Sequence, residues 1–406
     1  RDGHVNRREF LAAMGALGIT ATTAGSLLGS ASALAASPTR GGSVIFASNL
    51  HGPDDTLDPI LGTSTIDYSR ANAMYNGLIQ VWDDMSLHPE LAEEWSVNDN
   101  ATQYTFKIRK GVSFHNGGEL TAADVVYSMN RHIAPGSPSS IKSFFSSVIE
   151  WRALDKYTVK LNLSSPDADM PFKLTQPQAK IVKKNSMDKW GAGTGPYTLD
   201  AFQAGVKSVH SRNNNYWRDT GQWLDGIEMT AITDPNARLN ALLAGSVDMI
   251  TAIQAKHIKK VESAGKSMLS IPSGLYGGIC CLKNTEPGSN HDLVQGLRYI
   301  QDRERIVRKF LKGQGTVGND HPINVAYGAD HCHELPQIPY DPDKAKYHLN
   351  KSGYSEAELY VAPVIGFIED ACLLMQANLK KIGFNLKLKR VPTDGYWGAV
   401  WMKEPL

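Results

Sequence analysis

Runs of apolar residues, some continuous and some alternating with polar ones, divide the chain into short predicted strands. Residues 43–47 form a continuous apolar run typical of a buried strand. Residues 103–109 and 157–163 alternate between apolar and polar side chains, which predicts strands with one exposed face. We predict further strands over residues 77–82, 197–202, 207–211, 227–232, 247–250 and 385–391, with residues 197–202 and 207–211 paired.

Helical periodicity and helix-capping residues mark the segments between these strands. Thr121 precedes an apolar-periodic run and Asp124 stands three residues later, which predicts a capped helix start. Asp234-Pro235 predicts another start, and Gly245 predicts its end. We predict helices over residues 66–75, 122–129, 237–244, 293–299, 303–311, 342–351 and 369–382. Strands and helices are mixed along all 406 residues, so the fold class is α/β or α+β, in several lobes.

The charge of the chain argues against nucleic acid and anionic lipid as partners. The chain contains 42 Lys and Arg and 41 Asp and Glu. The first 35 residues hold three basic and two acidic residues, so the remainder carries equal numbers of both signs. A neutral chain without a basic block lacks the positive surface that such partners require.

The first 35 residues resemble a signal for export. Arg7 and Arg8 form a twin-arginine motif, a moderately apolar stretch follows, and Ala33-Leu34-Ala35 is a small-x-small cleavage pattern. We therefore predict a twin-arginine signal peptide over residues 1–35 and a periplasmic location. An N-terminal membrane anchor is the alternative, which the Gly and Thr content of the stretch disfavours.

No catalytic or cofactor motif stands out in the sequence. We find no Gly-x-Ser-x-Gly, His-Glu-x-x-His or phosphate-binding loop, and we predict that residues 191–195, rich in glycine, form a turn. The segment His331-Cys332-His333-Glu334 is a possible metal site, but a second pair of ligands is lacking nearby, which favours a solvated loop. We expect the four cysteines to be small buried side chains rather than disulfides. We predict no catalytic residue, no metal site and no cofactor.

Several blocks of sequence, in order, resemble the signature of family 5 extracellular solute-binding proteins, the dipeptide, oligopeptide and nickel receptors of ABC importers. The blocks cover nearly all of residues 41–396. They are residues 91–95, 104–117, 120–126, 193–197, 212–217, 235–248, 297–303 and 340–345. Most of these residues are expected to serve turns, caps and packing rather than ligand contact.

The resemblance implies the type II periplasmic-binding-protein fold, with two α/β lobes joined by a hinge. On that pattern lobe I comprises residues 39–80 and 186–272, an inserted domain of lobe I comprises residues 81–185, and lobe II comprises residues 273–406. The same pattern places the C-terminal part of lobe II beyond Leu406, including the Asp that holds a peptide's α-amino group in peptide-binding relatives.

The resemblance also implies where a ligand would bind. Ligands of this family lie in the cleft between the lobes, which suggests Asn49, Leu50 and His51 after the first strand. Tyr276, just past Pro272 at the hinge, and Trp397 and Trp401 in lobe II complete the set. Aromatic side chains can cover apolar ligand groups with little specificity, while backbone groups pair with a peptide main chain. Ordinary packing is the alternative for each residue.

The function that follows is that of a monomeric receptor rather than of an enzyme. It would capture a small solute, deliver it to ABC permease subunits in the inner membrane and bind no nucleic acid. Short peptides are the ligand class that we favour; nickel chelates, haem, opines and sugars are alternatives. A different class of function is an exported metal-dependent hydrolase that uses His331 and His333.

Overall fold

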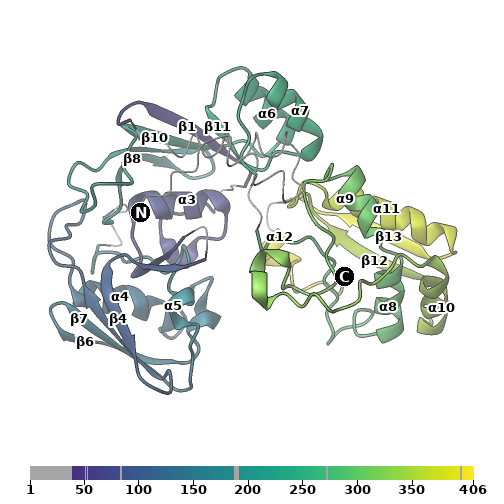
Figure 1. Ribbon diagram of the computed structural model, residues 1–406, viewed down its shortest axis with the longest axis horizontal. Helices are drawn as coiled ribbons and strands as arrows, with labels where there is room; N and C mark the ends of the chain where they lie inside the picture. The colour runs from purple at the N-terminus through teal and green to yellow at the C-terminus, as the bar shows by residue number, and fades with distance from the viewer. Residues whose placement is uncertain are drawn as a thin grey trace, which may run out of the picture.

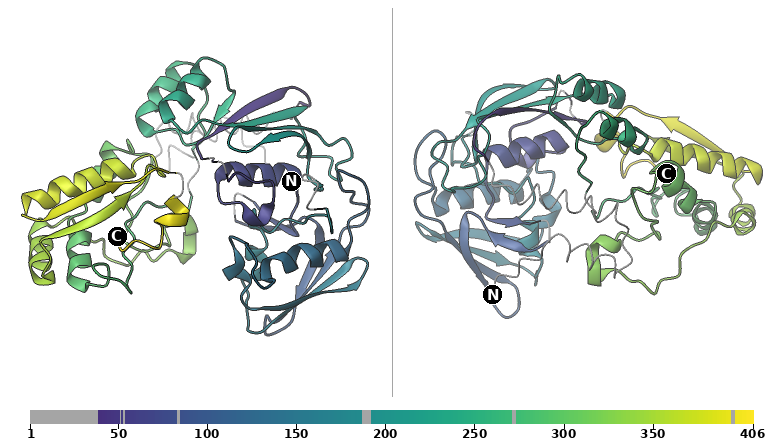
Figure 2. Two further views of the ribbon diagram at one scale, coloured as in Figure 1. Left: turned by 180° about the vertical axis from the view of Figure 1, so that it is seen from behind. Right: turned by 45° about the horizontal axis from the view of Figure 1, so that its top comes forward.

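The computed structural model describes residues 39–50, 52, 54–82, 85–186, 192–270, 273–393 and 396–406. The predicted signal peptide, His51 and Pro272 lie outside these residues. The chain forms two masses (Figure 1), one with both large sheets and the other with residues 273–406. Helices α6 and α7 lie beside the junction of the two masses, and the views in Figure 2 agree.

A five-stranded mixed sheet forms the part of the first mass that lies nearest to the junction. The strand order is β11-β1-β10-β9-β8, and β1 runs parallel to both of its neighbours. Helix α3 packs on one face, through Phe46, Ile66 and Met229 among others, while α6 packs near β11 through Leu242. The strands are β1 (Ser43–Ser48), β8 (Tyr197–Gln203), β9 (Lys207–Arg212), β10 (Gly226–Ala231) and β11 (Met249–Ile250). The helices are η1 (Pro59–Leu61), α3 (Thr65–Met74), α6 (Pro235–Leu243), η3 (Ala255–His257) and α7 (Ile258–Ser263).

A four-stranded antiparallel sheet, in the order β4-β5-β7-β6, forms the rest of the first mass. Alternation along β5 and β7 puts Phe106 and Leu161 into one core with Met129 of α4. Its elements are β4 (Ala92–Val97), β5 (Gln103–Ile108), α4 (Ala122–Ile133), η2 (Lys142–Phe145), β6 (Val148–Asp155), β7 (Thr158–Leu163) and α5 (Met170–Lys173), with the hairpin β2 (Ile79–Val81) and β3 (Leu87–Pro89) beside them.

The predicted cap of α4 is confirmed. The Asp124 carboxylate accepts hydrogen bonds from the Thr121 backbone N–H at 2.9 Å and from the Thr121 hydroxyl at 2.7 Å. Its other oxygen accepts the Lys184 N–H at 2.9 Å, so this carboxylate also ties the chain after the sheet to the helix start. A buried acid with three donors fixes the helix against its neighbour.

The glycine-rich segment before β8 is a close contact between backbones. The Gly195 N–H donates to the Met74 carbonyl oxygen at 2.9 Å, at the C-terminal end of α3. A methyl group added at Gly193 would lie 1.8 Å from the Met74 oxygen, which no side chain tolerates. Residues 193 and 195 pack on a helix C-terminus and do not open a helix, as predicted, but residues 192–194 are irregular and the chain bends at residues 195–196 rather than forming a hydrogen-bonded turn.

Residues 273–406 fold around the parallel pair β12 and β13. Leu297 of α8, Leu349 of α10 and Met375 of α11 share a core with these strands. Backbone hydrogen bonds also place residues 405–406 between Leu282 and β12. The elements are α8 (His291–Tyr299), α9 (Arg303–Lys309), η4 (Val325–Asp330), α10 (Pro342–Ser352), β12 (Glu356–Val361), α11 (Ile368–Lys381), β13 (Asn385–Arg390) and α12 (Tyr396–Ala399).

The mixed α/β class is confirmed, and so are the predicted helices and strands, with ends that differ by a few residues. The pairing of β8 with β9 is confirmed as antiparallel. Strands β3, β4, β6 and β12 and helices α5, α7 and α12 were not among the predicted elements. In the part of the chain that the structure describes, no helix has the length and apolar character needed to cross a membrane.

Candidate functional site

The carboxyl ends of three parallel strands define the candidate site on the first mass. Strands β11, β1 and β10 lie side by side and run in one direction. In open α/β sheets, ligands bind outside the carboxyl ends of parallel strands. The β1 arrow ends on the side that is turned toward residues 273–406 (Figure 1). Asn49 directly follows β1 and therefore lies at this edge.

Asn49 is held by the strand next to β1. The Thr251 hydroxyl, one residue past β11, donates a hydrogen bond to Asn49 Oδ1 at 3.1 Å. The Thr251 N–H donates to the Ala47 carbonyl oxygen at 3.2 Å, which extends the β1–β11 pairing. Asn49 and Leu50 are both half-buried. His51, the third residue predicted from this loop, lies outside the described residues.

A buried arginine, Arg238 of α6, joins the ends of β10 and β11. Its guanidinium donates to four backbone carbonyl oxygens: Ile232 at 2.6 Å, Thr233 at 3.1 Å, Thr251 at 2.9 Å and Ala252 at 3.1 Å. Only 3% of Arg238 is exposed, and burial lowers the pKa of its guanidinium. The cation is therefore satisfied by carbonyl dipoles, which hold the edge around Asn49 rigid.

A second buried arginine, Arg70 of α3, anchors the loop that continues from Asn49. Arg70 Nη1 lies 3.0 Å from Asp55 Oδ2 and 3.5 Å from Asp67 Oδ1, and Arg70 Nε donates to the Ser208 hydroxyl at 3.1 Å. Asp55 in turn accepts the Gly52 N–H at 3.0 Å. A buried ion pair therefore holds this loop in place. Replacing only one member of the pair is costly, because it leaves the other charge buried without a partner.

Tyr276 lies near the start of residues 273–406, and it is 53% exposed. Aromatic rings lie close to the glycines on either side of Tyr276. A methyl group at Gly274 would lie 2.6 Å from Tyr327 Oη, and one at Gly277 would lie 2.6 Å from Phe367 Cζ. Because the backbone is braced on both sides, Tyr276 projects from a fixed segment.

Trp397 and Trp401 form an exposed aromatic pair around α12. Their ring centroids lie 5.5 Å apart at 72°, and Tyr396 lies against Trp397 at 5.1 Å. Burial raises the pKa of Tyr396, whose ring lies against that of Trp397. The aromatic candidates share one mass with Tyr276.

The structure brings the candidates together in two groups rather than in one. Asn49 and Leu50 belong to the first mass, while Tyr276, Trp397 and Trp401 belong to the second. Among the described residues, no hydrogen bond or ring contact joins the two groups. The masses meet close to them, since a methyl group on Gly366 would lie 3.4 Å from Gln254 Cγ, three residues past Thr251.

Sequence reasoning missed Thr251, Arg238 and Tyr327 as parts of this region. Arg238 had one detectable signal, because a charged residue occupies an early position of a helix that otherwise packs on a sheet. Thr251 and Tyr327 carry no signal of this kind. Their partners, Asn49 and Gly274, are far away in sequence, so only the fold pairs them.

The His331–Glu334 segment is exposed or half-exposed. His331 Nδ1 lies 2.7 Å from the Ile323 carbonyl oxygen, and the rings of His321 and His333 lie 5.5 Å and 4.5 Å from that of His331. Within the described ranges, no three His, Cys, Asp or Glu side chains are placed to hold a metal ion.

The expectation that the cysteines are buried was wrong for two of the four. Cys372 is buried, Cys281 is half-buried, and both Cys280 and Cys332 are exposed. All four are free thiols. Cys332 belongs to the loop after η4, and Cys280 to the segment before α8, so neither lies in a packed element.

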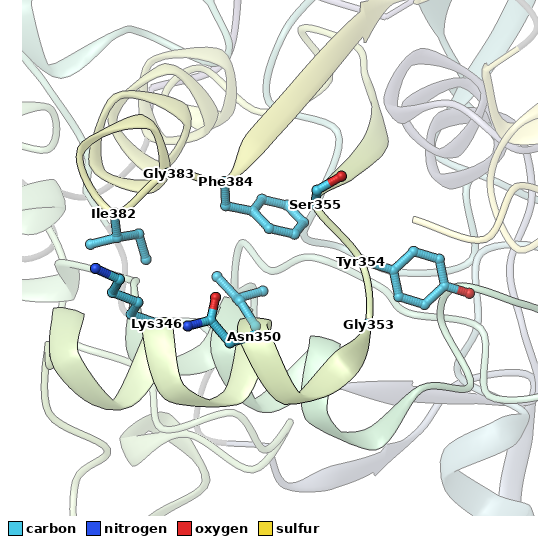
Figure 3. A pocket seen from close by; sticks show the side chains of 9 residues that line it. Lys346, Asn350, Gly353, Tyr354, Ser355, Ile382, Gly383 and Phe384 are labelled. Atoms are coloured by element: carbon cyan, nitrogen blue, oxygen red, sulfur yellow. The ribbon is translucent and has the colours of Figure 1, made fainter.

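A pocket of about 360 Å³, seen from close by in Figure 3, lies beside α10, on the side of the second mass that is turned away from the first (Figure 1). Lys346 and Asn350 come from α10, Ser355 precedes β12, and Phe384 precedes β13. The pocket therefore lies at the amino ends of the two parallel strands. Since ligands of such sheets bind at the carboxyl ends, we do not assign this pocket to the candidate site.

The chain is similar to known proteins of one family. The family described as "Bacterial extracellular solute-binding proteins, family 5 Middle" matches residues 86–404. The glutathione-binding protein GsiB of Escherichia coli K12 is 27% identical over 308 residues, which cover 74% of this chain and 59% of GsiB. The chain thus spans less than two thirds of the length of such relatives.

Solved structures share the fold. The agropinic acid complex of AgaA from A. tumefaciens R10 has a TM-score of 0.74 and 26% identity, over 86% of this chain and 73% of AgaA. The nonapeptide complex of AppA from Bacillus subtilis has a TM-score of 0.75 and 21% identity, over 88% of this chain and 76% of AppA. The expected periplasmic-binding-protein fold is confirmed by these likenesses.

Proposed function

The chain belongs to the family 5 bacterial extracellular solute-binding proteins, and on this premise we propose that it is the binding component of an ABC importer. It captures a small solute between lobe I and lobe II, closes on it by hinge motion and delivers it to permease subunits in the inner membrane. Lobe I comprises residues 39–80 and 186–272 with 81–185 inserted, and lobe II comprises residues 273–406.

We propose short peptides as the solute. Two observations support this class: GsiB is named a glutathione-binding protein, and AppA was solved with a nonapeptide. The exposed aromatic rings of Tyr276, Trp397 and Trp401 suit the varied side chains of peptides, because apolar stacking discriminates little among them. Nickel chelates, haem, opines and sugars are the competing classes.

The proposal includes no covalent chemistry. Closure is driven by ligand contacts that exist only in the closed state, so the ligand shifts a pre-existing equilibrium. We propose that the protein works as a monomer in the periplasm after export by the twin-arginine route, and that Asn49, Leu50 and His51 meet the ligand from lobe I.

The family membership is the observation that carries the proposal, and a thermal-melt screen tests it. The purified protein is heated with glutathione, the tetrapeptide Ser-Thr-Ser-Ala, nickel–histidine, haem and sugars in separate samples. A ligand at about a hundred times its Kd adds roughly 2.7 kcal/mol, which raises the Tm by several degrees.

Chromatography of each solute after incubation separates binding from catalysis. A Tm shift with a peptide that is recovered unchanged supports the proposal. Turnover of any solute, with activity lost when His331 and His333 are both replaced by Ala, supports an exported metal-dependent hydrolase instead. A shift with only a metal chelate, haem or sugar rejects peptides as the cargo.

A further inference from the structure

The side chain of Asn49 has a defined orientation at the edge of the five-stranded sheet. Its Oδ1 accepts the hydrogen bond from the Thr251 hydroxyl at 3.1 Å. The two residues are far apart in sequence, and β1 and β11 place them side by side at the carboxyl ends of parallel strands. A carboxamide held through its oxygen turns its NH₂ group the other way.

Thr251 is itself fixed by both of its backbone groups. Its N–H donates to the Ala47 carbonyl oxygen at 3.2 Å, and its own carbonyl oxygen accepts from Arg238 Nε at 2.9 Å. Arg238 holds the adjoining Ala252 carbonyl as well, at 3.1 Å. The hydroxyl that orients Asn49 therefore rests on a rigid segment, and Arg238 acts on Asn49 only through Thr251.

The Nδ2 group of Asn49 is the free half of the carboxamide. No hydrogen bond from Nδ2 to another residue occurs within the part of the chain that the structure describes, whereas Oδ1 is engaged. Asn49 is only half-buried, so the two N–H donors are open to a ligand. A half-buried donor gains most when it meets a strong acceptor.

We propose that Asn49 forms a subsite for an oxygen acceptor of the ligand, a peptide carbonyl or a carboxylate, and that Thr251 is the positioning residue that aims it. The two free Nδ2 donors match an oxygen acceptor, whereas an ammonium group could use only the remaining lone pair of Oδ1. The buried positive charge of Arg238, which is hydrogen-bonded to the Thr251 carbonyl oxygen, also favours an oxygen acceptor at this position, because it attracts an electronegative ligand atom. This inference rests on the function proposed above.

Four variants test the subsite: Asn49→Ala, Asn49→Asp, Thr251→Val and Thr251→Ser. Titration calorimetry at pH 7 measures the Kd of each for glutathione and for Ser-Thr-Ser-Ala. Asn49→Ala should weaken binding about five- to tenfold, the loss of one hydrogen bond. Asn49→Asp replaces the donor by a charged acceptor of the same shape, so its loss should exceed that of Asn49→Ala.

The two Thr251 variants separate positioning from packing. Thr251→Val keeps the shape without the hydroxyl, and its affinity for the peptide should fall about threefold or more. Thr251→Ser keeps the hydroxyl, and its Kd should stay within about twofold of wild type. Combined with Asn49→Ala, Thr251→Val should add little, because the hydroxyl acts through Asn49. Melting temperatures of all four variants serve as the control for folding.

The outcomes distinguish this inference from the proposed function. Wild-type protein that binds a peptide, with Asn49→Asp as tight as wild type or tighter, overturns the acceptor subsite and leaves the receptor function intact. Fully additive losses in the double variant overturn the positioning role of Thr251. Wild-type protein that binds neither peptide overturns the peptide receptor and the acceptor subsite together.

Discussion

Replacing Arg238 by Met should destabilise the five-stranded sheet more than any surface substitution. Methionine reaches about as far as arginine Nε, so the change keeps the aliphatic stem and removes the guanidinium group. The four carbonyl oxygens of Ile232, Thr233, Thr251 and Ala252 then lose their donor. These oxygens end β10 and β11, and the loss falls on both strands at once.

The magnitude follows from two opposing contributions. Hydrogen bonds from a charged donor are worth about 1.5–3 kcal/mol each, so four of them set an upper bound of about 12 kcal/mol. Part of this lost stability is offset. Because Arg238 is only 3% exposed, removing its cation also removes the cost of desolvating that cation on folding. We expect a net loss of about 3–4 kcal/mol in the free energy of unfolding, or roughly 6–16 °C in Tm for a lobe-sized unit.

Thermal and urea unfolding of the wild type, Arg238→Met and Arg238→Lys measure the effect. Lysine keeps the charge but cannot span four acceptors with a single ammonium group, so it should fall between the other two proteins. Arg308→Met is the matched control, because Arg308 is exposed and should shift the Tm by less than about 1 °C.

A Tm for Arg238→Met within about 2 °C of wild type would refute the reasoning. The carbonyl groups would then find other donors, water included, at no net cost. Equal losses in Arg238→Lys and Arg238→Met would show that geometry alone matters and that the charge contributes nothing.

Three further predictions concern stability. Gly193→Ala should abolish or severely reduce folding, since its methyl group would lie 1.8 Å from the last carbonyl oxygen of α3, while Gly318→Ala, which meets nothing within 4 Å, should melt like wild type. Burial lowers the pKa of His132 and of His210 from the ordinary 6.5 to about 4, so the unfolded chain binds more protons between these pH values. The free energy of unfolding should therefore fall as the pH drops from about 6.5 to 4, by on the order of 3 kcal/mol for each histidine, and a flat profile in urea unfolding at several pH values would contradict the burial of neutral imidazoles. Asp124→Ala should cost about 2 kcal/mol in the same assay, because it removes the acceptor of three hydrogen bonds at the start of α4, and a loss below about 0.5 kcal/mol would mean that water replaces them.

The sequence predicted most elements, because local chemistry decides them. The cap of α4 depends on Thr121 and Asp124, three residues apart, and strand β5 shows its face by alternation alone. Strand β6 was not predicted, because its sequence lacks such a local pattern. Only Trp151 of its eight residues is buried, so its pattern carries almost no periodic signal.

The candidate site was predictable only in part. The sequence resemblance pointed to Asn49, Leu50 and the aromatic residues, and the structure places Asn49 at the carboxyl ends of parallel strands. The sequence could not predict the hydrogen-bond partner of Asn49 or the role of Arg238. Those depend on which strands become neighbours, and the order β11-β1-β10 places the first strand of the chain between two strands that come much later in the sequence.

The sequence by itself determined the family, the α/β class and most local structure, because periodicity, caps and turn residues act over a few positions. The tertiary structure alone decided which half of the Asn49 carboxamide is engaged and which is free. That contact joins residues 49 and 251 through a hydrogen bond of 3.1 Å. Such a contact forms only after non-local strands have paired, and the local pattern of apolar and polar residues contains no trace of it.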